Sequence, residues 1–591
     1  MMTLISCGGF LPVLTRSRPM YRLRWRTWRR PRRVGETAHS TRPAVASQQS
    51  LGSTPAWGTP QLGRSRTGAY PYAHAPDARI FDMTHLDAAS PSTVQPQGYW
   101  DGQQARNASQ ERFADAPLRS TDMPAPVTDR AANVADNAIP IEGNDRGNSL
   151  PNLQTPDGKR ITNSELHVGE QATVTREQTI ADYGITSDQV VFTTGARDDN
   201  VQISQRDDGT LDVEVNGESY AVRLTERQEL TLRTGGGNDT ITAAPNVTVN
   251  LVIDAGAGDD AIRTGMGDDR IFGGDGNDSI ETIGGRNDID GGNGDDTITA
   301  GDGDNIIFGG AGNDMIRAGN GFNFIEGGLG NDEIFGGAGQ NILSGGRGDD
   351  VIHVDPAGRS SAYAGLGNDT INGAGANDLV YTEVGDLVNA ATNARPTVVN
   401  VEIDTSAGQT IAVTGSEQFR QRVESELDFL RSSAAGTQML SELDAAVENK
   451  GNRVTIQELG NEQNGYAQTF GRGGAEIVNG RAGVGGDVTI GYNPSFHMDA
   501  FPAPTVVLYH EMSHAYNGVN GTFQPGTYSG SGPDRGIRNA ERQAVGLETS
   551  APAFDFDGDP GTPPTTHNPI HLTENGLRRE LGMPDRPTYR L

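Results

Sequence analysis

A period of nine residues constrains this sequence more than any other feature. From Ala255 to His353 the chain divides into eleven consecutive nonapeptides of the approximate form Gly-Gly-x-Gly-x-Asp-x-U-x, where U is a large aliphatic residue. Residues 273–281 (GGDGNDSIE) and 309–317 (GGAGNDMIR) are two of them. A single period held this long predicts a repeat architecture in which each unit stacks on its neighbours. It also localises much of the glycine, which totals 79 residues.

These nonapeptides resemble the RTX, or haemolysin-type, calcium-binding repeats. The resemblance implies a parallel β-roll in which two nonapeptides make one turn, the aliphatic residues stack inside, and Asp carboxylates with loop carbonyls bind several Ca²⁺ ions. The general chemistry agrees, because Ca²⁺ prefers six to eight oxygen ligands and Gly permits turns with positive φ. The predicted calcium ligands are the aspartates at the sixth position: Asp260, Asp269, Asp278, Asp296, Asp314, Asp332 and Asp350.

From Asp278 onward, Asp and Asn alternate at this sixth position. If two nonapeptides make one turn, alternate repeats lie on the same edge of the roll, so one edge carries only Asp and the other only Asn. An Asn amide is a weaker ligand for a hard cation, but stacked Asn side chains can hydrogen-bond along a ladder. We therefore hypothesise that Ca²⁺ occupies mainly the Asp edge. The alternative is that both edges bind Ca²⁺. The residues of the Asn edge are Asn287, Asn305, Asn323 and Asn341.

The second informative stretch is His510-Glu511-Met512-Ser513-His514, which follows an apolar run. Neither Pro nor Gly interrupts residues 505–517, so a helix is predicted there. Positions i and i+4 share one helix face, so His510 and His514 can bind one zinc ion, with Glu511 as general base. The alternative is a surface helix with two solvated histidines.

A catalytic zinc site needs a third protein ligand and an open fourth position. A metzincin would continue as HExxHxxGxxH, but Asn517 and Asn520 stand at the matching positions and exclude that pattern. Residues 539–546 predict a short helix ended by glycine. Glu541 in this helix is the predicted third ligand, a gluzincin-like arrangement, and Asp534 and Glu548 are the alternatives.

Three blocks of the C-terminal part, residues 509–518, 541–547 and 573–582, together resemble the NleD-like effector metallopeptidases. The resemblance covers roughly residues 415–591. It implies a zinc endopeptidase in which His510, His514 and Glu541 bind zinc and Glu511 is the catalytic base. Known members are type III secreted effectors that cut host signalling kinases. The repeat array departs from those compact members, which leaves the injection route and the kinase substrate open.

The rest of the sequence sets the organisation. A net charge of −30 argues against nucleic acid and anionic membrane as partners, and Cys7, the one cysteine, rules out an internal disulfide. The sequence contains no run of 18 apolar residues, so no membrane-spanning helix is predicted.

We predict a disordered basic and polar leader over 1–160, a small β region over 161–254, an all-β roll over 255–385, a linker with strands over 386–414 and an α+β zincin-like domain over 415–591.

The combined prediction is a zinc endopeptidase that acts on a protein substrate, possibly from a host, and that is secreted or injected without an evident Sec-type signal peptide. One alternative is a calcium-binding adhesin or matrix protein with an inactive protease fold. Another is a protein that cuts its own linker near residues 383–416. Tyr528, Tyr516 and His571 are candidate donors to the oxyanion of the reaction.

Overall fold

The structure is a computed structural model that describes residues 138–181, 184–460, 468–471, 474–495, 503–558 and 561–590. Most of the predicted leader, residues 1–137, lies outside these ranges. The β structure begins at β1 (Ile139–Glu142), earlier than the predicted residue 161. This strand is too short for its own pattern to identify it, and it exists because it pairs in parallel with β9 (Glu218–Arg223).

Antiparallel strands precede the roll. The strands β4 (Arg160–Val168), β5 (Thr173–Ala181) and β6 (Gly184–Gly195) pair in sequence order. Short strands β2 (Asn148–Ser149) and β3 (Leu153–Gln154) pair with β4.

The strands β7 (Asn200–Gln205), β8 (Leu211–Val215) and β9 form a meander. Asn216 and Gly217 form the turn that joins β8 to β9, and both residues have positive φ, 51° and 88°. A tight hairpin turn of the primed type needs this backbone conformation.

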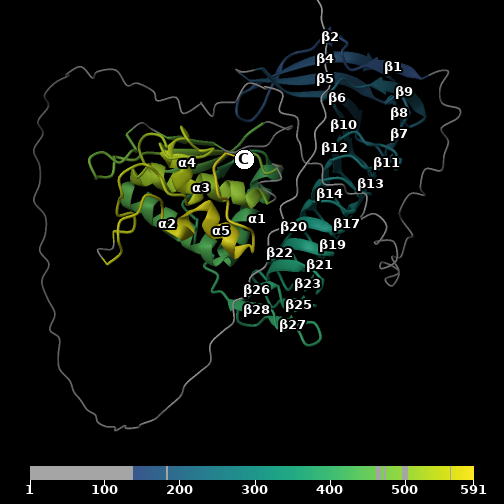
Figure 1. Ribbon diagram of the computed structural model, residues 1–591. Coiled ribbons are helices and arrows are strands. Elements are labelled where there is room, and N and C mark those ends of the chain that lie inside the picture. The colour runs from purple at the N-terminus through teal and green to yellow at the C-terminus, as the bar shows by residue number, and fades with distance from the viewer. Residues whose placement is uncertain are drawn as a thin grey trace, which may run out of the picture. The chain divides into compact units, whose positions relative to one another are not determined.

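From β10 (Glu229–Gly236) onward, the chain winds as a parallel β-solenoid with two sheets, whose strands follow one another as rungs in Figure 1. Ile262 pairs with Ile280, and Ile280 pairs with Ile298, so the repeat along the roll is two nonapeptides per turn. The predicted β-roll is confirmed. One sheet contains β11 (Thr240–Ala243), β13 (Ala261–Arg263), β15 (Ser279–Glu281), β17 (Thr297–Thr299), β19 (Met315–Arg317), β21 (Glu333–Phe335), β23 (Val351–His353), β25 (Thr370–Asn372) and β27 (Leu387–Asn389). The other contains β12 (Leu251–Ala257), β14 (Arg270–Asp275), β16 (Asp288–Asn293), β18 (Ile306–Ala311), β20 (Gly321–Leu329), β22 (Gly339–Arg347), β24 (Arg359–Tyr363), β26 (Leu379–Thr382) and β28 (Thr397–Asn400).

The aliphatic position of each nonapeptide forms the core of the roll. Side chains from the two sheets meet inside it and exclude water, which is the main favourable term in folding. The central members are each at most 1% exposed: Ile262, Ile271, Ile280, Ile289, Ile298, Ile307, Ile316, Ile325, Ile334, Leu343 and Ile352.

The C-terminal region is α+β, as predicted. A four-stranded sheet has the order β29-β30-β32-β31. Its strands are β29 (Ile411–Thr414), β30 (Val454–Glu458), β31 (Gln468–Gly471) and β32 (Val488–Tyr492). The strand β32, which precedes the HExxH helix in the chain, is therefore interior, and the antiparallel strand β31 forms the edge beyond it.

The helices are α1 (Glu417–Ser432), α2 (Ala434–Lys450), α3 (Pro504–Asn520), α4 (Asn539–Val545), the 3₁₀ helix η1 (Ile570–Leu572) and α5 (Glu574–Glu580). None of these helices, nor any other in the described ranges, combines the length and apolarity needed to cross a bilayer.

Candidate functional site

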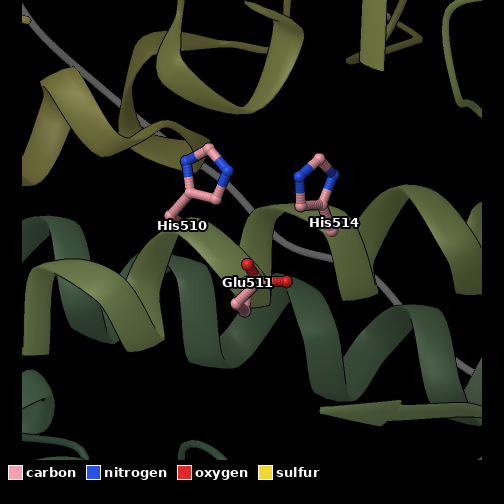
Figure 2. Close-up of side chains that lie close together, drawn as sticks. All are labelled: His510, Glu511 and His514. Atoms are coloured by element: carbon pink, nitrogen blue, oxygen red, sulfur yellow. The ribbon is translucent and has the colours of Figure 1, made fainter. Parts of the chain in front are cut away.

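Helix α3 brings the three residues of the HExxH motif together. It begins at Pro504 and ends before Gly521, whose φ of 73° closes the helix. Figure 2 shows both imidazole rings on the same side of α3, with the Glu511 carboxylate between and below them in this view. One ligand atom from each of His510, Glu511 and His514 lies within 4.8 Å of the others. All three are buried, so the alternative of two solvated histidines does not describe them.

Glu541, on the short helix α4, reaches the same point. Its Oε2 lies 3.0 Å from His514 Nε2 and 3.8 Å from His510 Nε2. The predicted third ligand is thus adjacent to both histidines, on the face of α3 that carries them. Helix α4 stops at Gly546, which has a φ of 89°, as the sequence indicated.

A buried amide network fixes α4 against α3. Gln543 is fully buried, and its Nε2 donates to Asn517 Oδ1 at 2.9 Å, to Asn568 Oδ1 at 2.8 Å and to the Thr522 carbonyl at 3.0 Å. Asn517 stands where a metzincin would have glycine, and here it anchors the helix that carries Glu541. Satisfied buried networks of this kind hold side chains in one arrangement.

Glu574 supports His510 from the side opposite the other donors. Its Oε2 is 3.0 Å from His510 Nδ1 and also accepts a hydrogen bond of 2.9 Å from Arg586 Nη1. Arg578 Nη1 lies 3.5 Å from Oε1. A carboxylate on the second ring nitrogen fixes the tautomer and orientation of a metal-binding histidine. Our sequence reasoning noted the block containing Glu574 only as a family resemblance and did not assign it this position.

The electrostatics of the cluster favour a cation. Burial lowers the pKa of His510, but the carboxylates of Glu541 and Glu574 outweigh it and raise the pKa to about 9. Burial raises the pKa of Glu541, yet the two histidines outweigh this and hold it well below its usual range. Two imidazole nitrogens and one carboxylate oxygen facing one point are a donor set that suits Zn²⁺. The residues present therefore fit a catalytic zinc site.

The other candidates from the sequence lie elsewhere. Tyr528 lies against the Arg542 guanidinium, 3.9 Å from the ring centre. Tyr516 and His571 both hydrogen-bond to Glu442 of α2, the latter at 2.6 Å. Their hydroxyl and ring groups are thus engaged away from the histidine cluster.

The alternative ligands also have different partners. Asp534 forms a buried ion pair with Arg542. Glu548 is exposed and accepts a hydrogen bond of 2.9 Å from Thr566. Neither carboxylate faces the cluster.

Tyr589 is the tyrosine that the structure places beside the site. Its ring centre is 6.2 Å from that of His510, and its hydroxyl hydrogen-bonds to Glu541. Asp534 holds it there, because Oδ2 accepts the Tyr589 backbone N–H at 2.9 Å. Burial raises the pKa of the phenol, so it remains a proton donor. It lies outside the three blocks that carry the family resemblance, so the sequence alone did not indicate it.

The Asp edge of the roll contains a ladder of half-satisfied carboxylates. Asp278 Oδ1 accepts the Asp260 backbone N–H, and Asp296 Oδ1 accepts that of Asp278, each at 2.8 Å. The second oxygen is buried and has no hydrogen-bond partner among the described residues. Burial raises the pKa of Asp296 to about 8. On this edge the carboxylates with such an oxygen include Asp260, Asp278, Asp296, Asp314, Asp332, Asp350 and also Asp369, and Asp269 has one on the other edge.

These free oxygens share their space with backbone carbonyls of the neighbouring strands. A methyl group placed on Gly273 would lie 2.3 Å from Asp278 Oδ2 and 2.5 Å from the Gly291 carbonyl oxygen. The same pair of oxygens recurs beside Gly291, Gly309 and Gly327. Carboxylate oxygens without a partner, facing one small space together with carbonyl oxygens, fit Ca²⁺.

The Asn side chains of the other edge find their hydrogen-bond partners within that edge. Asn305 Nδ2 donates to the carbonyls of Gly301 and Gly303, at 3.1 and 3.2 Å, and to Asn323 Oδ1 at 3.0 Å. Asn323 continues the ladder to Asn341 Oδ1, also at 3.0 Å. The amide nitrogen thus hydrogen-bonds to loop carbonyls of its own edge.

The first position of the nonapeptide distinguishes the two edges as well. It is glycine at 273, 291, 309, 327 and 345 on the Asp edge, whereas the other edge has Thr264, Thr282, Ala300 and Ala318; Ala255 on the Asp edge and Gly336 on the other depart from this pattern. From Gly273 to Ala318 the alternation was available in the sequence. Asp269 belongs to the second edge, since its backbone N–H donates to Asn287 Oδ1 at 3.2 Å.

The fold and the site together define a class of protein: a solenoid of calcium-type repeats joined to an α+β domain with a buried His-Glu-His cluster. Comparison with protein families makes this specific. Residues 407–589 match the Peptidase_M91 model, described as an effector protein. Four copies of the RTX calcium-binding nonapeptide repeat match residues 252–280, 282–316, 317–352 and 357–386. The chain therefore carries a peptidase effector domain behind RTX calcium-binding repeats, and both predicted resemblances are confirmed. No curated protein matches the chain.

Proposed function

We propose that the C-terminal domain is a zinc-dependent endopeptidase, with His510, His514 and Glu541 as zinc ligands and Glu511 as the general base. The observation that carries this proposal is the approach of both Nε2 atoms to Glu541 Oε2, at 3.0 and 3.8 Å. Three protein donors leave the fourth position for water, as catalytic zinc sites require.

Bound zinc would acidify its water and polarise the scissile carbonyl. Glu511 takes the proton from the attacking water as its oxygen bonds to the carbonyl carbon. The same carboxyl then gives the proton to the leaving nitrogen as the C–N bond breaks. Tyr589 is the best-placed side chain to donate a hydrogen bond to the oxygen that gains negative charge. Glu574 keeps His510 oriented throughout.

A protein substrate follows from the peptidase family. The edge strand beyond β32 is the antiparallel strand β31, and an extended substrate segment would add to the sheet there. An effector domain with RTX repeats supports secretion, and we propose a host protein as the substrate.

The test is proteolysis by the full chain loaded with zinc and calcium, using a peptide mixture from a digested proteome and mass spectrometry of the new ends. Glu511→Gln should reduce the cleavage rate about 10²–10⁴-fold, the range for loss of a general base. Glu548→Gln, an exposed carboxylate outside the cluster, should cleave like the wild type. Equal rates for Glu511→Gln and the wild type, or no cleavage by a zinc-loaded chain, would favour a non-enzymatic adhesin or matrix protein. The intact mass of the two chains shows whether residues 383–416 are cut by the protein itself.

We further propose that Ca²⁺ occupies mainly the Asp edge of the roll. The support is the contrast between the unpartnered Oδ2 atoms on that edge and the amide ladder on the other. Elemental analysis of the purified chain in millimolar calcium should give about one ion per turn of the roll. A value near two per turn would show that the Asn edge also binds calcium.

A further inference from the structure

Helix α5 contacts the candidate zinc site at one end and the roll at the other. Glu574, its first residue, holds His510 Nδ1 at 3.0 Å. Glu580, its last residue, accepts a hydrogen bond of 2.9 Å from the Tyr381 hydroxyl on its backbone carbonyl. The Tyr363 hydroxyl lies 3.5 Å from its Oε1. A helix of seven residues is about 10 Å long and moves as one body, so a shift at one end displaces the other.

The two tyrosines are products of the roll's winding. Tyr363 on β24 pairs directly with Tyr381 on β26, one turn further along. Their rings stack with centres 4.4 Å apart and planes within 3°. Phe429 of α1 packs on Tyr363 at 4.8 Å. Only the wound roll sets these two side chains one above the other.

Glu580 gives the roll a second connection to the site. Its carboxylate accepts the backbone N–H groups of Ala434 and Ala435, at 2.9 and 2.8 Å, and so holds the start of α2. The Ala435 carbonyl in turn accepts a hydrogen bond of 2.9 Å from Tyr509, the residue before His510. Both connections begin at the same pair of roll tyrosines.

Helix α1 docks on the roll through buried polar contacts. Arg422 Nη2 lies 2.7 Å from Asp288 Oδ1, and both side chains are at most 4% exposed. Ser425 donates to Glu326 Oε1 at 2.8 Å. Because single buried partners are costly to leave unpaired, the peptidase domain is stabilised in this arrangement by a folded roll.

We propose that α5 transmits calcium-dependent folding of the roll to the zinc site, with Glu574 as the positioning residue for His510. This rests on the zinc site proposed above. Without calcium, the stacked carboxylates of the Asp edge repel one another and the roll does not wind. The tyrosine pair is then lost, α5 is released and His510 loses its fixed orientation. The peptidase thus acquires high zinc affinity only where calcium is available.

The experiment measures two quantities on the full chain in millimolar calcium and in calcium-depleted buffer prepared without a chelator. The first is zinc affinity, by competition with a zinc-selective chromogenic chelator. The second is hydrogen exchange of residues 574–580. The variants are Glu574→Gln and the double change Tyr363→Phe with Tyr381→Phe. Tyr220→Phe is the matched control, a fully buried tyrosine whose hydroxyl bonds to Glu218 at 2.7 Å, away from α5.

In the wild type, calcium should raise zinc affinity at least about tenfold and protect residues 574–580 from exchange. Glu574→Gln should lower zinc affinity about 10–100-fold at saturating calcium, as expected for an outer partner of a metal ligand. The double tyrosine variant should bind zinc about two- to tenfold more weakly than the wild type at saturating calcium, the effect of a lost hydrogen bond. Tyr220→Phe should match the wild type.

Zinc affinity and exchange that do not depend on calcium would overturn the proposal and leave the zinc peptidase intact. An equal loss in Tyr220→Phe would also overturn it, by showing a general effect of roll stability. Absence of zinc binding at every calcium concentration would overturn the zinc site itself, and the coupling with it.

Discussion

The two candidate cation sites differ in how they are satisfied without a cation. In the C-terminal domain the donors pair with one another, Glu541 with His514 and Glu574 with His510, each at 3.0 Å. In the roll, the Oδ2 atoms of the Asp edge are buried and have no partner among the described residues. The pKa of Glu541 is lowered, whereas burial raises that of Asp332 to about 8. The donors of the candidate zinc site are thus paired and in place without a metal, whereas we expect the roll to need calcium to fold.

The largest expected effect follows from removing each metal in turn. EGTA, which takes up calcium and zinc, should abolish the β signal of the roll in circular dichroism. Phenanthroline, which takes up zinc, should leave that signal unchanged. The reason is that the Asp edge leaves buried carboxylate oxygens without a partner, whereas the donors of the zinc cluster pair with one another. Restoring calcium alone after EGTA should restore the β signal. A roll that stays folded in EGTA would remove the contrast between the two sites.

Glu541→Ala should remove zinc and leave the fold in place. One of three protein ligands is lost, so zinc affinity should fall more than about 100-fold, beyond the effect of an outer-shell change. Elemental analysis after dialysis measures the zinc, and circular dichroism checks the fold. Glu548→Ala, in the loop after the same helix, should retain zinc. Full zinc occupancy in Glu541→Ala would assign the third ligand to another residue.

Exchanging the chemistry of the two edges of the roll tests their difference directly. Asn305→Asp with Asn323→Asp replaces amides that donate to loop carbonyls with carboxylates that cannot. At calcium concentrations just sufficient to fold the wild-type roll, this should destabilise the roll by about 1–3 kcal/mol for each lost set of buried bonds. In saturating calcium, the number of bound ions should rise.

Asn331→Asp is the control for these exchanges, because it adds a negative charge at an exposed position of the Asp edge and keeps the oxygen that accepts the Asp349 backbone N–H at 2.7 Å. It should change neither the stability nor the ion count. Calcium-dependent unfolding in denaturant and elemental analysis report both quantities. An unchanged ion count in the double variant would show that the Asn edge excludes calcium for a reason other than its amides.

Much of the roll could be predicted because its determinants are local. The nine-residue period contains the turn glycine, the edge carboxylate and the core aliphatic residue, and pairing over two repeats follows from it. The strand β1 could not be predicted, because four residues carry too little pattern and its partner β9 is distant. The edge position of β31 likewise depends on sheet order, which no local pattern of the sequence specifies.

The residues of the candidate site likewise fall into those that local sequence predicts and those that tertiary packing brings in. His510, Glu511 and His514 lie on one helix, so spacing alone placed them together. Glu574 and Tyr589 arrive through tertiary packing, from α5 and from the segment that Asp534 holds. Their roles depend on distances between side chains in the folded protein, which the residue order alone does not specify. Tyr516, a predicted oxyanion donor close to the motif, hydrogen-bonds to Glu442 instead.

The smallest expected effect concerns pH at the contact between α1 and the roll. Burial raises the pKa of Glu326 and of Glu426 to about 8, and both are fully buried. The folded state therefore keeps these protons up to about pH 8, whereas the unfolded chain releases them near 4.5. The contribution of these two groups to the free energy of unfolding is fully present below about pH 4.5 and is lost as the pH rises to about 8. The slope is about 1.4 kcal/mol per pH unit for each group.

Glu326→Gln isolates this effect, because Gln stays neutral and keeps an acceptor for Ser425. In saturating calcium, the variant's gain in unfolding free energy over the wild type should grow by about 2 kcal/mol between pH 6 and pH 8. Glu424→Gln changes an exposed carboxylate of α1 and should show no such trend. Comparing variants at each pH cancels the opposite effect of pH on calcium binding by the Asp edge. A pH-independent difference would mean that Glu326 is ionised in the folded protein, held by Arg422 across the interface, and that this contact is stabilised by charge.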